Sequence, residues 1–177
     1  MRKIVLVFLI LALSAGSALA LDMEAKSFYA QGIFALPTGD WSDAAGNGFG
    51  GGIGMLVPHN EQLNFRGEVS FIKFGGKSFG DYDWSYRVIP IVALAEYTFQ
   101  YDSPLYGLGG LGLYMGHFSA DYTGPDGFGF GSYDDNNNDF GLVIGGGYHV
   151  NEQICVEGRF NIVSDSNELT IHGVYHF

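Results

Sequence analysis

Two pairs of opposite charges stand two residues apart in segments that alternate between polar and apolar side chains. Arg66 and Glu68 belong to one segment, and Glu157 and Arg159 belong to another. Residues two apart in a strand share a face, so each pair lies with the other polar residues of its segment. Two acids and two bases on facing polar surfaces can neutralise one another as salt bridges or line a path for ions. Either role requires strands that bring the two polar faces together.

A second candidate is His117 with Ser119, which could act as base and nucleophile in the cleavage of an acyl ester. This His-x-Ser pair resembles that of the lipid A deacylase barrels. Ala120 stands where those enzymes have asparagine, and no acid stands at the expected downstream spacing, although Asp121 and Asp126 are near. We therefore predict a polar pair at a membrane rim and no enzyme, with lipid A modification as the less favoured alternative.

Metal and redox chemistry have little support in the sequence. Asp135, Asn137 and Asp139 have the spacing that begins a calcium loop, but Phe140 replaces the glycine at the sixth position and Gly146 the glutamate at the twelfth. We predict a solvated polar loop here, and no cofactor or metal site. The single cysteine, Cys155, cannot form an internal disulfide and is predicted to be a small lining side chain.

The elements that would position these residues are strands. In residues 63–71, odd-numbered positions are apolar or glycine and even-numbered positions polar, and residues 154–162 alternate in the same way. The eight predicted strands cover residues 26–36, 49–57, 63–74, 84–99, 104–119, 139–150, 153–163 and 168–177. Pro90 is predicted to cause a bulge in the fourth. The connections alternate between tight and long, which is typical of outer-membrane barrels.

A repeat supports this arrangement, because residues 49–71 align without gaps on residues 140–162 at an offset of 91. Aromatic side chains are predicted to gather at both ends of the strands, as in the belts of a membrane barrel. The predicted outer belt is Trp41, Trp84, Tyr86, Phe118 and Tyr122. The predicted inner belt is Tyr97, Phe99, Tyr148, Tyr175 and Phe177.

The N-terminus indicates export. Arg2 and Lys3 precede an apolar stretch at 4–13, and small residues end in Ala18-Leu19-Ala20, an A-x-A cleavage site. We predict that residues 1–20 are a cleaved signal peptide and that 21–177 form one domain. Its charge of 6 − 19 = −13, once Arg2 and Lys3 are removed, excludes nucleic acid as an expected partner.

The final residues of the chain alternate between the two faces of a predicted strand. Leu169, Ile171, Gly173, Tyr175 and Phe177 form one face, and Thr170, His172, Val174 and His176 form the other. This pattern, with its terminal aromatic, resembles the closing strand of a bacterial outer-membrane β-barrel. The resemblance implies that the barrel assembly machinery reads this strand.

Residues 32–41, Gly-Ile-Phe-Ala-Leu-Pro-Thr-Gly-Asp-Trp, and the glycine-rich segments that start at Phe49 and Pro104 resemble the outer membrane β-barrel protein family, which includes OmpA-like, OmpX-like and OmpW-like barrels. The resemblance implies an all-β fold, an eight-stranded antiparallel up-and-down transmembrane β-barrel in the Gram-negative outer membrane. Outer-membrane lipid and lipopolysaccharide would surround it, as a monomer. A structural or surface-interaction role is expected, with a narrow porin-like channel for small or hydrophobic solutes as the alternative. The structural alternative is a soluble lipocalin-type barrel, in which the apolar faces of the strands would line the interior and the polar faces would contact water.

Overall fold

The computed structural model describes residues 26–76, 82–100, 103–122, 133–164 and 166–177. The predicted signal peptide, 1–20, lies outside the described residues. A short helix, α2 (Trp41–Ala44), follows the first strand. The strands are β1 (Ser27–Pro37), β2 (Gly48–Pro58), β3 (Leu63–Phe74), β4 (Tyr82–Thr98), β5 (Leu105–Tyr122), β6 (Tyr133–His149), β7 (Ile154–Val163) and β8 (Glu168–His176). No helix in these described ranges is long and apolar enough to cross a membrane.

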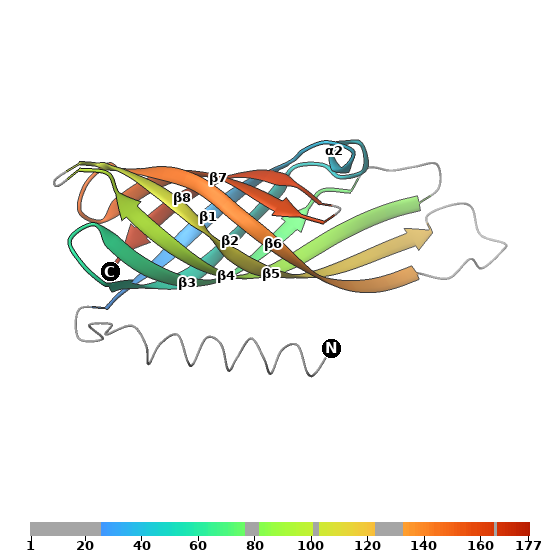
Figure 1. Cartoon of the computed structure of the whole chain (residues 1–177). Coiled ribbons are helices and arrows are strands. Elements are labelled where there is room, and N and C mark those ends of the chain that lie inside the picture. The colour runs from blue at the N-terminus through green and yellow to red at the C-terminus, as the bar shows by residue number, and fades with distance from the viewer. Residues whose placement is uncertain (1–25, 77–81, 101–102, 123–132, 165) are drawn as a thin grey trace.

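The eight strands form one closed barrel in which every strand pairs antiparallel with its neighbours in sequence (Figure 1). Closure comes from the pairing of β1 with β8, in which Gly32 lies opposite Gly173. The C-terminus and the tight turns lie at one end, and α2 lies at the other end. The predicted eight-stranded antiparallel up-and-down barrel is therefore confirmed.

Strand β6 starts earlier than predicted, at Tyr133 instead of residue 139. The predicted loop at Asp135–Asp139 is strand, with Asp135 opposite Phe118 and Asp139 opposite Tyr114. Asp and Asn have low strand propensity, so the sequence favoured a loop, but pairing with the long β5 overrides that preference. In the described part of the chain, no group of three or more His, Cys, Asp or Glu could hold a metal.

The predicted bulge at Pro90 was wrong. Val69 pairs with Ile91, and Ile72 pairs with Val88, so no residue is inserted between these two pairs. The pairs in between are missing from the β3–β4 ladder, because a proline has no N–H to donate. The ladder is interrupted but its register is unchanged, and β4 keeps a regular alternation from Ser85 to Tyr97.

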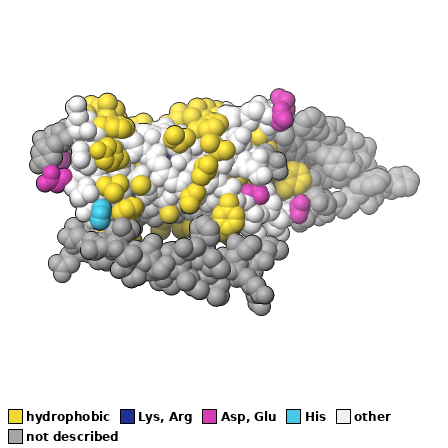
Figure 2. Space-filling model, viewed as in Figure 1, with side chains coloured by type: hydrophobic (Ala, Val, Ile, Leu, Met, Phe, Trp, Pro, Cys, Tyr) yellow, Lys and Arg dark blue, Asp and Glu magenta, His cyan; other side chains and the backbone are white. Residues whose placement is uncertain are grey.

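The outside of the barrel is apolar and the polar residues of most strands face inward, as a membrane barrel requires. Figure 2 shows hydrophobic side chains over the middle of the visible face and acidic side chains towards its ends. The predicted inner belt is exposed on this outer surface at Tyr97, Phe99, Tyr148, Tyr175 and Phe177. The structure also settles the facing of β5, where Tyr106, Leu108 and Tyr114 are buried and Leu105 and Leu111 are exposed.

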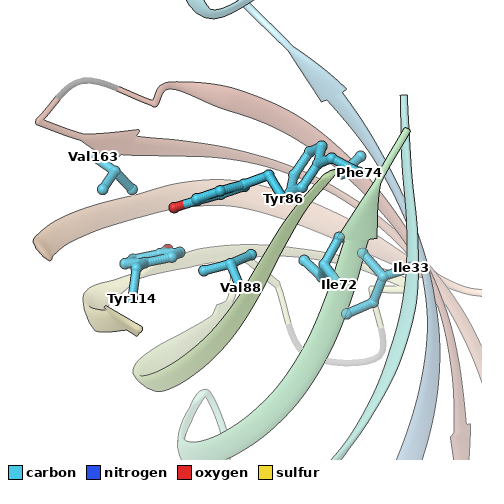
Figure 3. Close-up of a cluster of buried hydrophobic side chains, with 8 residues drawn as sticks. Ile33, Ile72, Phe74, Tyr86, Val88, Tyr114 and Val163 are labelled. Atoms are coloured by element: carbon cyan, nitrogen blue, oxygen red, sulfur yellow. The ribbon is translucent and has the colours of Figure 1, made fainter. Parts of the chain in front are cut away.

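The predicted outer belt was wrong for three of its members. Tyr86 is buried inside the barrel, and Trp41 and Phe118 pack against the same interior cluster. This cluster fills the half of the lumen near α2, and most of its members are labelled in Figure 3. Trp41 covers it, with ring centroids 5.9 Å from Phe74 and 5.0 Å from Tyr86. The side chains of Trp84 and Tyr122 lie outside the described part of the structure.

Candidate functional site

The four charges singled out from the sequence meet inside the barrel. Two salt bridges cross the lumen between β3 and β7, with Arg66 Nη1 2.6 Å from Glu157 Oε1 and Arg159 Nη1 2.6 Å from Glu68 Oε2. One more runs along each strand, from Arg66 to Glu68 at 2.9 Å on β3 and from Arg159 to Glu157 on β7. All four side chains are at most 3% exposed. The salt-bridge interpretation of these residues therefore fits the geometry, and we call the four residues the charge cluster.

The charge cluster joins positions that the sequence repeat relates to each other. Arg66 and Glu157 are 91 residues apart, and so are Glu68 and Arg159. At each repeated position one copy carries an acid and the other a base, so the two copies complement each other across the barrel. Three strands lie between β3 and β7 on either side of the closed barrel, which places β3 and β7 on opposite walls.

A third acid, Glu96 on β4, belongs to the same cluster and was missed from the sequence. Its Oε2 lies 3.1 Å from Arg66 Nη1, and its Oε1 accepts a hydrogen bond of 2.8 Å from Asn64 Nδ2. A bulge at Pro90 would shift the alternation of β4, so with the predicted bulge the sequence could not assign Glu96 to the inside or the outside of the barrel. A regular alternation through Pro90 would have placed Glu96 inside the barrel and Arg87 outside.

Two tyrosines complete the cluster. Tyr29 Oη donates to Glu68 Oε1 at 2.5 Å, and Tyr106 Oη donates to Glu157 Oε1 at 2.7 Å. Arg66 Nε also donates to Tyr29 Oη at 3.0 Å, and the Arg66 guanidinium lies 4.6 Å from the centre of the Tyr29 ring. Each carboxylate of the two crossing salt bridges thus accepts a hydrogen bond from a neutral hydroxyl in addition to its bonds to arginine. A buried charge requires such additional hydrogen bonds, because it has lost its contacts with water.

Each of these tyrosines crosses over a glycine on the next strand. Tyr29 is paired with Gly54, and Tyr106 is paired with Gly147. A Cβ added at either glycine would overlap the tyrosine ring. The signal in the sequence is a tyrosine facing a glycine across a hairpin, but it can be found only once the register is known.

The glycine positions give a testable expectation. Gly54→Ala should lower the free energy of unfolding by about 1–3 kcal/mol, because the new methyl group displaces the Tyr29 ring from Glu68. Gly67→Ala is the matched control, since a Cβ there meets nothing within 4 Å. Urea unfolding of the two variants in detergent measures the difference, and equal midpoints would show that the Tyr29 contact is not tightly packed.

Between the charge cluster and the apolar cluster lies a layer of neutral hydrogen bonds. His172 Nδ1 is 2.9 Å from Gln31 Oε1, and His172 Nε2 is 2.9 Å from Thr170 Oγ1. Gln31 Nε2 donates to Ser70 Oγ at 3.0 Å. A cavity of ≈ 20 Å³ borders this layer, with room for about one water molecule. Charged, polar and apolar layers therefore succeed one another along the lumen.

In the structure, His117 and Ser119 contact two different neighbouring strands. Both lie on the odd-numbered face of β5, which is the outside of the barrel. Ser119 Oγ is 3.0 Å from Ser85 Oγ, and His117 Nδ1 is 2.8 Å from Asn136 Oδ1. Each side chain is held by a cross-strand neighbour, which is the arrangement expected of polar pairs near a strand end.

The C-terminal strand faces as its alternation predicts. Leu169, Ile171, Tyr175 and Phe177 are exposed on the outside, and Thr170, His172 and Val174 are buried inside. Gly173 shares the outward face. Cys155 is fully buried near the end of the barrel that carries the tight turns, and its Sγ lies 2.9 Å from His149 Nδ1.

Comparison with known proteins agrees with this architecture. The profile of the outer membrane protein beta-barrel domain matches residues 8–176. The barrel is similar in structure to Ail, the attachment invasion locus protein of Yersinia pestis, with a TM-score of 0.64 and 13% identity over 86% of this chain and 97% of that one. Neisserial surface protein A has a TM-score of 0.55 and 19% identity over 86% and 97% of the two chains.

The N-terminal barrel domain of Pseudomonas aeruginosa OprF has a TM-score of 0.51 and 9% identity over 85% of this chain and 97% of that one. At these identities the structural matches show the fold alone. No curated protein matches the sequence. The match of the family profile over nearly the whole chain shows that this protein belongs to the outer membrane protein beta-barrel domain family and is a small barrel of the bacterial outer membrane.

Proposed function

We propose that this protein is a closed, non-enzymatic barrel that contributes to the integrity or surface interactions of the envelope. The observation that supports it best is the filled lumen, in which the charge cluster, the polar layer and the apolar cluster follow one another. An eight-stranded barrel is just wide enough for side chains to fill its interior. Of the six buried acidic and basic side chains of the described lumen, five are joined by salt bridges, and the sixth, Glu168, accepts a hydrogen bond from Asn161 Nδ2 at 2.9 Å.

Planar-bilayer recording tests this proposal against the narrow-channel alternative. Purified, refolded protein should leave the bilayer silent, because an ion would have to displace both crossing salt bridges and the apolar cluster. Regular conductance steps that scale with the amount of protein would contradict the proposal. A loss of those steps on Glu157→Gln would then assign the path to the charge cluster.

The absence of enzyme activity is part of the proposal. Ser119 and His117 have separate cross-strand partners on the outside of the barrel, which supports a structural role for both. Overexpression should leave the mass spectrum of lipid A unchanged. A new deacylated species that disappears with Ser119→Ala would overturn this part. We also propose that the barrel works as a monomer, which light scattering of the detergent complex checks.

We further propose that the barrel assembly machinery reads the C-terminal strand through Phe177 and the apolar face behind it. Phe177→Ala should reduce the amount of folded protein in the outer membrane severalfold, without a comparable loss of stability in the refolded protein. Phe99→Ala is the matched control, since Phe99 is another exposed aromatic at the same end of the barrel (61% against 75% exposed). Equal outer-membrane levels of the two variants, measured by immunoblot, would contradict the proposal.

A further inference from the structure

Two cations face each other on the outside of the barrel. Lys73 on β3 is paired in register with Arg87 on β4, and both side chains are exposed. Arg87 is paired in turn with His117 on β5, so the three residues form one row across three strands. Like charges directly opposite each other destabilise a sheet. Such a pair is unexpected in a chain with a net charge of −11, unless an anion lies between the two cations.

Neither cation is neutralised by a carboxylate that the structure describes. Five salt bridges are present among the described residues, and all of them involve Arg66 or Arg159 inside the barrel. On the side towards the tight turns, the outward neighbours of Lys73 and Arg87 are Phe71 and Ile89, and Phe49 is paired with Lys73 on β2. The pair therefore stands at the edge of an apolar surface, with no carboxylate of a described side chain bound to it.

The row lies where the apolar surface ends. From Tyr97 in the inner belt to Ile89, the outward residues of β4 are apolar or small, and the next one is Arg87. The eight steps from residue 89 to residue 97 rise about 20 Å along the barrel axis at a tilt of about 40°. Lys73 and Arg87 thus lie at the level of lipid headgroups, at the end of the barrel opposite the tight turns. In the outer membrane this is the outer leaflet.

An apolar groove starts directly below the two cations. It is a shallow depression, open to the outside of the barrel, with a volume of ≈ 400 Å³. Its floor is the backbone of Gly51 and Gly52 on β2, and its walls are Ile53, Val69, Phe71 and Ile89. Phe71 precedes Lys73 by two residues, and Ile89 follows Arg87 by two, so groove and cations share one outer face. The groove exists because Gly51, which is paired with Phe71, has no side chain between Phe49 and Ile53.

We propose that Lys73, Arg87 and the groove form a binding site for one phosphorylated, acylated lipid of the outer leaflet, lipid A being the lipid of that chemistry. A phosphate would lie between the two cations, and an acyl chain would lie in the groove. This inference rests on the membrane position of the barrel and not on whether the barrel conducts. It explains why two like charges are tolerated side by side and why β2 carries glycine at this level.

Binding of purified lipid A to the refolded barrel in detergent micelles tests the site. The shift in unfolding temperature is followed for lipid A with its phosphates and for the dephosphorylated form. Wild type should bind the phosphorylated form more tightly. Lys73→Gln with Arg87→Gln should weaken that binding by at least about tenfold. Lys73→Arg with Arg87→Lys, which keeps both charges, should bind as wild type does.

Both variants must first show the heat-dependent gel shift of the wild type, so that loss of binding is not loss of fold. Equal affinity of the Gln variant and wild type would overturn the site, as would equal affinity for the two forms of lipid A. Sucrose octasulfate could also displace lipid A while the acyl chains make no difference to the affinity. That result would assign the two cations to a soluble polyanion and would refute the lipid site.

Discussion

Arg66→Met is expected to lower the free energy of unfolding by about 3–5 kcal/mol, the cost of removing one partner from a buried ion pair. Arg66 contacts Glu68, Glu96 and Glu157. Its loss leaves three buried acids with Arg159 as their one remaining cation among the described residues. The methionine fills a similar volume, so the effect reports charge and hydrogen bonding more than packing. Urea unfolding in detergent, followed by the heat-dependent gel shift, measures it.

A double-mutant cycle separates the pair from its surroundings. Adding Glu157→Gln to Arg66→Met removes one of the stranded acids, so the double variant should be more stable than the sum of the two single effects predicts. Arg87→Met is the control for losing an arginine on the outside of the barrel, and it should change the unfolding midpoint little. Equal losses for Arg66→Met and Arg87→Met would show that the charge cluster does not stabilise the barrel.

Phe74→Ala is expected to cost about 3–5 kcal/mol, because it opens a cavity in the apolar cluster. Phe74 is 1% exposed, and its ring packs on Trp41 and on Tyr86. Its loss also removes the surface on which Trp41 rests, so Trp41 fluorescence, recorded in a Trp84→Phe background, should report a more polar surrounding in this variant.

Phe71→Ala is the matched control on the same strand. Phe71 faces outward, is 47% exposed and leaves no interior cavity when shortened. It should lose clearly less stability than Phe74→Ala and leave Trp41 fluorescence unchanged. The opposite ranking would mean that β3 faces the other way, with its even-numbered residues in the lipid.

The sequence predicted the number, order and facing of most strands because the alternation in residues 63–71 and 154–162 is regular. It also predicted which four charges would meet, since two polar faces in a narrow barrel must share one lumen. It could not predict that the lumen changes from charged to apolar along its length. Ile72 and Phe74 lie on the same face as Arg66 and Glu68, but two apolar residues at a strand end do not reveal that a cluster covers them.

The remaining differences have physical causes. Tyr86 and Trp41 were assigned to a lipid belt from their place in the chain, and only the facing of β4 and the position of α2 turn them inward. The sequence prediction missed two hydrogen-bond donors to Glu68 and Glu157. Tyr29 and Tyr106 reach these carboxylates from other strands, over Gly54 and Gly147. Such contacts depend on register, which a single strand does not encode.

The charge swap between the two repeats is the feature that links sequence and site most closely. A duplicated hairpin with identical charges would place Arg66 opposite a second arginine. The exchange of acid and base at an offset of 91 turns that repulsion into two crossing salt bridges. The repeat and the filled lumen are therefore parts of one arrangement.

Labelling of Cys155 by a water-soluble maleimide is the most direct test of a closed interior. Cys155 is fully buried inside the barrel, and its thiol contacts His149. In the folded, unheated protein the thiol should stay unlabelled, and it should react fully after boiling, in step with the change in gel mobility. Rapid labelling of the folded, compact form would show that water fills this part of the lumen, and it would contradict a barrel plugged by its own side chains.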